Sequence, residues 1–276
     1  MKWLHFILSH SFFISICAFF LCWQSYILLH IPVQFEVCLL IFFATLGSYN
    51  FYWLLSKYHF NDKRGLADFF TKNISNVLVL MSAATGVFFL RHLLPAMLQE
   101  IIVAVILTLA YSIPLWPVKS LAFTRKAGLL KTLLLAFTWT YVTIVIPVEQ
   151  ASLPWNWQVS LLFTARFMFM LMLCIIFDSR DVKVDKIRSL SSLATVVSRK
   201  TLGILIMAVL SVYLAAGFAL RFYFESGAQV FSFLITGLAV LVVYRLSLKK
   251  QGYFFYYFLV DGLMLFSAIT TILASI

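Results

Sequence analysis

Long apolar runs separated by short polar breaks make up most of this 276-residue chain. A helix crosses a bilayer with about 20 mostly apolar residues, whereas the strands of a membrane barrel alternate apolar and polar residues. The runs here are continuously apolar, so they predict an all-α, polytopic membrane protein. Nine spanning helices are expected, over Phe6 to Leu29, Val33 to Leu55, Ser75 to Leu90, Met97 to Tyr111, Gly128 to Ile146, Trp157 to Phe177, Thr201 to Phe222, Gln229 to Val243, and Tyr253 to Ile276.

The third and fourth runs are among the shortest of the nine. If they form a re-entrant pair, seven crossings remain. The first run follows Lys2 and resembles a signal peptide, but no small-x-small cleavage site follows and the run continues past Trp23. We therefore take it as the first span. All six prolines lie between runs or at their ends, where a missing backbone donor is least costly.

Composition and charge narrow the class further. Apolar residues make up 63% of the chain and charged residues 11%, against roughly 45 to 50% and about 25% in soluble proteins. This excludes a soluble globule and predicts a single integral membrane domain over residues 1 to 276. The net charge of +11 is spread between apolar runs, which argues against nucleic-acid binding. The four cysteines lie inside apolar runs and are interpreted as small hydrophobic residues.

The distribution of basic residues predicts the orientation, because Lys and Arg favour cytoplasmic loops. Most of the 21 Lys and Arg residues fall at one side of the predicted spans, the side of Lys2. Arg91 and Arg221 fall on the other side, and Arg166 lies within a span. We expect a cytoplasmic N-terminus, a C-terminus outside, and anionic lipid headgroups as partners of the basic loops.

The densest polar segment follows the sixth span. Asp178, Asp181 and Asp185 are spaced at i, i+3 and i+7, which places them within an arc of about 60° if the helix continues. Like charges on one helix face repel unless a cation lies between them. Oxygen ligands of this kind suit Mg²⁺ bound together with substrate phosphates. The alternative is a solvated segment of mixed charge beside the headgroups.

These residues resemble a known family. A nine-helix membrane protein with Asp178, Asp181 and Asp185 at the cytoplasmic end of its sixth span is similar to the UbiA-type intramembrane prenyltransferases, over nearly the whole chain. The resemblance implies transfer of an isoprenoid group from a prenyl diphosphate to a lipophilic, aromatic acceptor. It also implies that Mg²⁺ is the cofactor, held by aspartate-rich motifs after the second and sixth helices.

Other positions match the family less specifically. Asn50 stands where the first motif begins, and Tyr111, Ser112 and Pro114 with the later Lys119 resemble a Tyr-Ser-x-Pro element after the fourth helix. On this resemblance the three aspartates hold Mg²⁺ and Asn50 completes the catalytic site. The substrate-binding residues would be Tyr111, Lys119, Lys131, Arg180, Arg166 and Asp261, with the basic side chains of Lys119, Lys131 and Arg180 neutralising the leaving diphosphate.

The first motif departs from the family pattern. No carboxylate follows Asn50 over the segment from Phe51 to Lys57. This leaves a second reading open, a catalytically silent UbiA-like membrane protein that binds lipid or a partner. A transporter would be expected to show internal repeats or spans broken by Gly and Pro near the midplane, and the chain shows neither.

Two ionisable residues fall well inside predicted spans, which is costly and marks candidate functional positions. Arg166 precedes Asp178 by 12 residues, and Asp261 lies in the ninth span. One interpretation is a structural ion pair between Arg166 and Asp261, facing the bundle interior. The other is that both side chains line the acceptor pocket.

Overall fold

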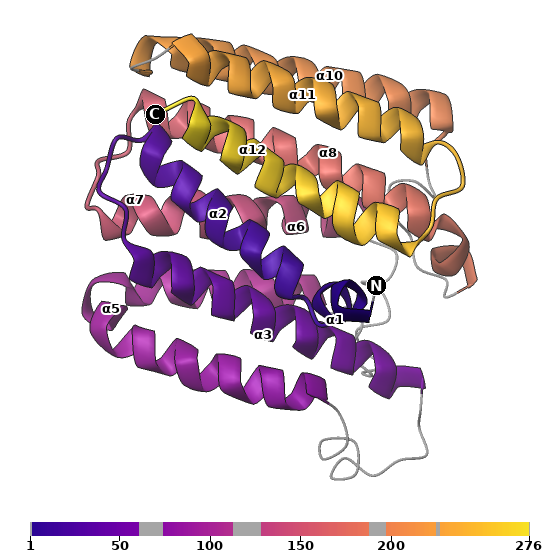
Figure 1. Cartoon of the computed structure of the whole chain (residues 1–276), viewed down its shortest axis with the longest axis horizontal. Helices are drawn as coiled ribbons and strands as arrows, with labels where there is room; N and C mark the ends of the chain where they lie inside the picture. Colours follow the sequence, from indigo (N-terminus) through magenta and orange to yellow (C-terminus); the bar gives the residue numbers. More distant parts are fainter. Residues whose placement is uncertain (1, 61–73, 113–127, 188–196, 225–226, 276) are drawn as a thin grey trace.

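The computed structural model is a bundle of helices that run side by side along its long axis (Figure 1). It describes residues 2–60, 74–112, 128–187, 197–224 and 227–275, with side chains described except at 2, 54–60, 74–75, 90–96, 112, 128 and 181–187. The described residues form helices and no strand. The expected all-α fold is therefore confirmed.

The helices follow the apolar runs. The first half of the chain forms α1 (Lys2–Ser9), α2 (Phe12–Leu28), α3 (Phe35–Phe60), α5 (Ile74–Ser112) and α6 (Gly128–Thr140). A π-helical turn η3 (Tyr141–Val145) joins α6 to α7 (Ile146–Gln150). The second half forms α8 (Trp157–Ile187), α10 (Arg199–Ala219), the 3₁₀ turn η4 (Leu220–Tyr223), α11 (Gly227–Ser247), the π-helical turn η5 (Phe255–Val260) and α12 (Asp261–Leu273).

Length and composition identify the membrane spans. Among the described residues, six helices are long and apolar enough to cross a bilayer. The number of candidate spans is seven if the bent pair of α1 and α2 is counted as one span. Two shorter apolar helices, Asn76–Phe89 and Met97–Tyr111, are the arms of α5. The multi-pass membrane fold is confirmed, and the count of nine crossings stays a prediction.

The first predicted span is not one straight helix. α1 and α2 meet at an angle of 66°, and Ser11 at the junction has a left-handed backbone with φ of 64°. A run of apolar residues shows no such break, because both helices satisfy the same hydrophobic pattern. The prediction of a single helix over Phe6 to Leu29 is therefore wrong.

Two further boundaries differ from the prediction. The third and fourth runs are joined in α5 without a loop, and the change of direction visible in Figure 1 coincides with non-helical φ and ψ angles at Met97, two residues after Pro95. The fifth run continues through η3 into α7, so Pro147 lies inside the span Leu129–Gln150, directly after the π-helical turn, and not beyond its end as predicted.

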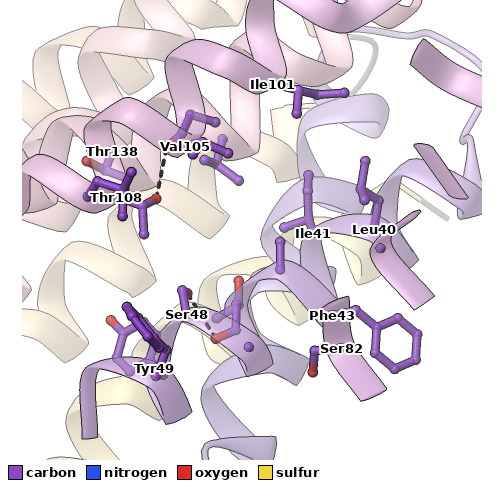
Figure 2. Close-up of a pocket in the computed structure, with 18 of the residues that line it drawn as sticks. Leu40, Ile41, Phe43, Ser48, Tyr49, Ser82, Ile101, Val105, Thr108 and Thr138 are labelled. Carbon is purple, nitrogen blue, oxygen red and sulfur yellow. Dashed lines mark hydrogen bonds between the residues drawn. The ribbon is translucent and has the colours of Figure 1, made fainter. Parts of the chain in front are cut away.

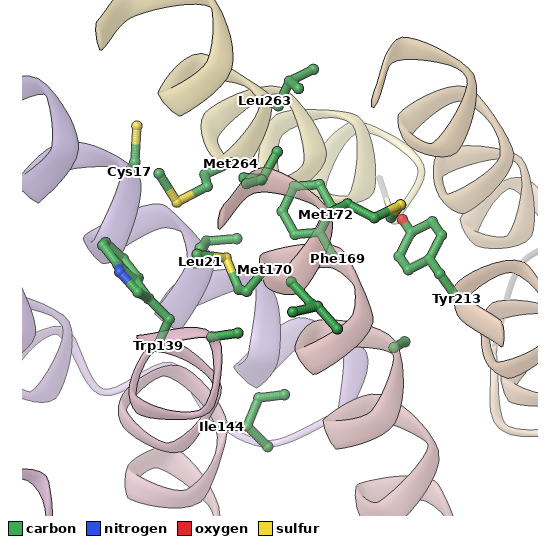
Figure 3. Close-up of a cluster of buried hydrophobic side chains, with 14 of the residues drawn as sticks. Cys17, Leu21, Trp139, Ile144, Phe169, Met170, Met172, Tyr213, Leu263 and Met264 are labelled. Atoms are coloured by element: carbon green, nitrogen blue, oxygen red, sulfur yellow. The ribbon is translucent and has the colours of Figure 1, made fainter. Parts of the chain in front are cut away.

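The core lies where α2, α6, α8 and α12 meet (Figure 3). Leu21, Trp139, Met170 and Met264 come together there, each less than a tenth exposed. On the outside, large apolar side chains such as Trp157 and Phe222 are 76% and 85% exposed. Exposed apolar side chains of this size suit a surface surrounded by lipid tails.

The two chain termini lie at opposite ends of the bundle (Figure 1). The N-terminus lies near the end at which α8 finishes, and the C-terminus lies at the opposite end (Figure 1). α8 extends ten residues beyond the predicted end at Phe177, to Ile187. The helix therefore does continue through Asp178, Asp181 and Asp185, as the carboxylate spacing requires.

Candidate functional site

Asp178 is the first polar residue beyond the apolar part of α8, and its side chain is half-buried. Thr132 of α6 donates its hydroxyl hydrogen to Asp178 Oδ2 over 2.6 Å. This short hydrogen bond to a carboxylate fixes the Asp178 rotamer and ties α6 to α8. The backbones of Asp181 and Asp185 continue on α8 towards Ile187, but their side chains lie outside the described residues.

Lys131 and Tyr111 are in contact near the start of α6, where Thr132 binds Asp178. Lys131 Nζ lies 5.7 Å from the centre of the Tyr111 ring, within the range of a cation–π contact. The same ring stacks on Tyr52 of α3, with centroids 5.4 Å apart and planes 17° apart. Because Lys131 immediately precedes Thr132, the structure places an ammonium group and the Asp178 carboxylate at one end of the bundle. Lys119 lies outside the described residues.

Arg180 is held by aromatic rings. Its guanidinium carbon lies 5.3 Å from the ring centres of Phe177 and Tyr256 and 5.0 Å from that of Tyr257. The rings of η5 thus form a wall beside the last turns of α8, with a guanidinium packed against it. Cation–π contacts of this kind contribute roughly 0.5 to 2 kcal/mol, depending on how far the cation is removed from water.

Asp261 is a buried carboxylate at the start of α12, directly after the π-helical turn η5. Its side chain is 4% exposed. Cys17 Sγ contacts its backbone oxygen at 3.4 Å. A buried carboxyl group is costly unless it is hydrogen-bonded or paired, which makes Asp261 a candidate position for binding a ligand.

Arg166 is 4% exposed and bonds to neutral oxygen atoms. Nη2 donates to Gln24 Oε1 over 2.8 Å and to Ser25 Oγ over 3.4 Å. Nη1 donates to Leu21 O over 3.2 Å and to Thr143 Oγ1 over 3.3 Å. The predicted ion pair with Asp261 is not formed, because α2 and η3 supply the guanidinium with oxygen acceptors that no charge pattern reveals.

Asn50 lies under the junction between α1 and α2, where it is 1% exposed. Its Nδ2 donates to His10 O over 3.0 Å and to Leu46 O over 2.8 Å. The hydrogen bond from the Asn50 amide to His10 O therefore holds the bend at Ser11 against α3. Its Oδ1 is the atom with which Asn50 could bind a cation.

The inner face of α8 brings the polar groups of the site together. Cys174 lies one turn before Asp178 on α8 and is buried. Thr132 of α6 binds Asp178, and Arg180 of α8 packs against the rings of Tyr256 and Tyr257. Among the described side chains, no group of three or more His, Cys, Asp and Glu residues could hold a metal ion. A metal site at Asp178 would thus need further oxygen ligands from outside the described side chains, among which Asp181 and Asp185 are the predicted ones.

Several contributors to this site were not predicted. They include Thr132, which orients Asp178, and Tyr52, which stacks on Tyr111. The rings of Tyr256 and Tyr257 were likewise not singled out. The only sequence signal for Thr132 is its position next to Lys131, and the aromatic residues are hidden among the many Phe and Tyr of the apolar runs.

Comparison with known proteins identifies the fold. No protein-family model and no curated protein significantly matches the chain. Among solved structures, the apo structure of a UbiA homolog from Aeropyrum pernix K1 is similar, with a TM-score of 0.65 and 15% sequence identity. The similarity covers 96% of this chain and 98% of that one. At this identity the likeness defines architecture rather than activity, and the chain therefore has the fold of a UbiA homolog along almost its entire length.

Proposed function

We propose that this protein binds a prenyl diphosphate at the α8 end of the bundle and transfers its isoprenoid group to a lipophilic, aromatic acceptor. The observation that carries the proposal is that Thr132, which binds Asp178, and Lys131, which lies over Tyr111, are neighbours on α6 in a bundle with the UbiA-homolog fold. A carboxylate that can hold a cation and an ammonium group that can bind an anion are both needed to hold a metal-bound diphosphate.

In this proposal Asp178, Asp181 and Asp185 hold Mg²⁺, with Oδ1 of Asn50 as a further oxygen ligand. The donor set fits the ion, since carboxylate and amide oxygens are hard ligands. Mg²⁺ supplies Lewis-acid stabilisation of the negative charge on the departing diphosphate. Thr132 keeps Asp178 in one rotamer, so the carboxylate is ready before the ion arrives.

The basic residues neutralise the diphosphate. Lys131 is held over Tyr111 at the same level as Asp178, and Lys119 and Arg180 are the further cations of the proposed site. The rings around Arg180 keep its guanidinium beside η5 while leaving it charged. The diphosphate departs only if the negative charge that develops on it is stabilised. We therefore expect these positive charges to affect the reaction rate more than the folding of the protein.

The acceptor is proposed to meet Asp261. Its buried carboxylate can accept a hydrogen bond from a hydroxyl group on an aromatic acceptor. Arg166, whose N–H groups are occupied by α2 and η3, would act as a positioning residue rather than by touching the acceptor. The proposed orientation keeps the N-terminus and the diphosphate site in the cytoplasm and the C-terminus outside.

Calorimetric titration of the purified full-length chain with geranylgeranyl diphosphate, with and without Mg²⁺, tests the proposal. Binding should require Mg²⁺, and Asp178→Asn should remove that requirement together with most of the affinity. Glu36→Gln is a matched control, because Glu36 is a carboxylate in the first turn of α3, at the other end of the bundle. Binding that ignores Mg²⁺ and survives Asp178→Asn would overturn the proposal in favour of a silent lipid-binding protein.

A further inference from the structure

Two cysteine side chains from different helices are in contact inside the bundle. Cys38 of α3 donates its S–H hydrogen to the Sγ atom of Cys22 of α2, with the two sulfur atoms 3.5 Å apart. Both side chains are fully buried. The other two cysteines have different surroundings, since Cys17 Sγ contacts the backbone oxygen of Asp261 and Cys174 lies on α8. Cys22 and Cys38 therefore form a pair of thiols with two further thiols for comparison.

The chain topology brings these two positions to the same level. α2 ends at Leu28 and α3 begins at Phe35, and the two helices run antiparallel (Figure 1). Cys22 precedes the end of α2 by six residues, and Cys38 follows the start of α3 by three. At roughly 1.5 Å per residue, both thiols lie within about 9 Å of the α2–α3 connection. That connection is at the end of the bundle where the C-terminus lies, opposite to the proposed diphosphate site.

The two sulfur atoms can be joined without moving the helices apart or past each other. A disulfide bond is about 2.05 Å long, so sulfur atoms at 3.5 Å need to approach by roughly 1.5 Å. Because each sulfur atom is only one rotatable bond from the backbone, a modest rotation of both side chains supplies this approach. The pair is thus positioned for a disulfide bond between α2 and α3.

The contacts of the pair distinguish Cys22 from Cys38. Arg166 Nη1 donates to Leu21 O over 3.2 Å, and Nη2 donates to Ser25 Oγ over 3.4 Å. The guanidinium therefore contacts the helical turn that carries Cys22. The sulfur atom of Cys22 is also the acceptor of the hydrogen bond from Cys38. A neighbouring cation and a donated hydrogen bond both stabilise a thiolate, so Cys22 is the better nucleophile of the two.

Burial restricts the oxidant that can act on this pair. A protein disulfide catalyst has to contact a thiol, whereas Cys22 and Cys38 have no exposed surface. A peroxide is small enough to enter through a transient local opening of the helices. In the predicted orientation the pair lies towards the outer side of the membrane, where disulfides form and persist, and away from the reducing cytoplasm.

We infer that Cys22 and Cys38 are a modification site at which a peroxide joins α2 to α3 through a disulfide bond. The sulfur atom of Cys22 attacks one peroxide oxygen, so that an S–O bond forms, the O–O bond breaks, and the leaving hydroxide takes the thiol proton as water. The sulfur atom of Cys38 then attacks Cys22 Sγ. The S–S bond forms, the S–O bond breaks, and a second water leaves with the proton of Cys38. Two thiols are oxidised to one disulfide, and one hydrogen peroxide is reduced to two waters.

The disulfide should stabilise the fold, and this effect does not depend on the proposed prenyl transfer. It closes a loop between positions 16 residues apart. Closing a loop of this length in the unfolded chain is expected to lower the equilibrium constant for unfolding about hundredfold. Denaturant unfolding of the oxidised chain should therefore shift to higher denaturant, and reduction with dithiothreitol should reverse the shift.

Peroxide treatment of the purified full-length chain, reduced beforehand, tests the inference. After denaturation and alkylation with N-ethylmaleimide, two of the four thiols should be protected, and peptide mass spectrometry should find Cys22 linked to Cys38. Dithiothreitol should restore all four thiols. The double variant Cys17→Ser and Cys174→Ser is the matched control and should form the same link. Met207 is 49% exposed, so its conversion to the sulfoxide reports that peroxide has reached the protein.

Single variants identify the sulfur atom that reacts first. Cys38→Ser should accumulate a sulfenic acid at Cys22, which dimedone traps. Cys22→Ser should leave Cys38 several-fold less trapped under the same conditions. Equal trapping in the two variants would overturn the assigned order of attack.

The unmodified chain decides the inference without any substitution, so a variant that fails to fold does not affect the test. If Met207 is oxidised while all four thiols remain open to alkylation, the pair is inert packing and the inference is overturned. A link that involves Cys17 or Cys174 in place of Cys22 and Cys38 would overturn it as well. A protected pair that dithiothreitol releases, with Cys22 and Cys38 in one cross-linked peptide, supports it.

Discussion

Arg166 Nη2 donates a hydrogen bond to Gln24 Oε1 over 2.8 Å in the interior of the bundle. Gln24 Nε2 in turn donates to Thr271 Oγ1 over 2.7 Å and to Ser267 O over 3.0 Å. A guanidinium on α8 is thereby linked to α12 through an amide on α2. The connection between these helices is a relay of neutral groups rather than an ion pair with Asp261.

This relay predicts an asymmetry between its members. Gln24→Leu removes the best acceptor of a buried cation and should lower the free energy of unfolding by about 2 to 3 kcal/mol. Arg166→Leu leaves neutral acceptors without a donor but no buried charge. It should therefore lower the free energy of unfolding by only about 1 kcal/mol. The double change should cost less than the sum, because Gln24 has no cation left to support. Denaturant unfolding in detergent measures all three.

The single and double variants of Arg166→Leu and Asp261→Leu are the control for the double-mutant cycle of Gln24 and Arg166. The two side chains do not contact each other, so their effects should add within about 0.5 kcal/mol. Recovery of stability in this double variant would instead support the ion pair and contradict the relay. A cycle in which Gln24 and Arg166 are strictly additive would likewise argue against a shared hydrogen bond.

The helical fold and the continuation of α8 through the three aspartates follow from the sequence because both depend on local patterns. Asp178, Asp181 and Asp185 share one face only if α8 continues past the apolar run, and it does, to Ile187. Charged residues at the end of a span are compatible with either helix or loop, so only the carboxylate spacing favoured the helix. The association of Lys131 with Tyr111 could be anticipated only through the family resemblance.

The features that could not be predicted depend on partners from distant helices. Arg166 was matched with Asp261 because charge is visible in a sequence, whereas acceptors such as Leu21 O are not. The bend at Ser11 is equally hidden, since apolar residues occupy both sides of it. A cavity lined by α3, α5 and α6 (Figure 2) likewise arises from small residues on α3 and α5 that only their packing brings to face each other.

Thr132 is predicted to act on the metal site through Asp178. Thr132→Val removes the 2.6 Å hydrogen bond and should weaken Mg²⁺-dependent binding of geranylgeranyl diphosphate about tenfold, as loss of a ligand-orienting partner does. Thr132→Ser keeps the hydroxyl group and should restore the affinity. Titration with Mg²⁺ at fixed diphosphate distinguishes this role from a general loss of folding. Equal affinities in the two variants would show that the hydroxyl group does not orient Asp178.

The orientation can be tested with single cysteines. Lys249 follows α11 and Trp155 precedes α8, at opposite ends of the bundle in the predicted topology. With an impermeant thiol reagent on intact cells, Trp155→Cys should be labelled and Lys249→Cys should not be until the membrane is permeabilised. All four native cysteines are buried, so they can stay in place as internal controls. Labelling at position 249 in intact cells would reverse the predicted orientation.

Asn50 combines two roles that one substitution separates. Its Nδ2 donates to His10 O and Leu46 O, while its Oδ1 is the proposed cation ligand. An ionised Asp at this position keeps the ligand oxygen but cannot donate a hydrogen bond. Asn50→Asp should therefore lower the free energy of unfolding by about 1 to 3 kcal/mol, because two buried carbonyl oxygens lose their donor.

The same variant should keep or strengthen Mg²⁺-dependent diphosphate binding, since a carboxylate is the better ligand for the ion. Asn50→Leu, which removes both donor and ligand, should lose stability and Mg²⁺ dependence together. Calorimetry on the folded fraction, isolated by size-exclusion chromatography, measures binding separately from folding. If folded Asn50→Asp and folded Asn50→Leu proteins both bind the diphosphate with the Mg²⁺ dependence of the unmodified chain, Asn50 serves only to fasten the α1–α2 junction to α3, and the metal site is completed from another helix.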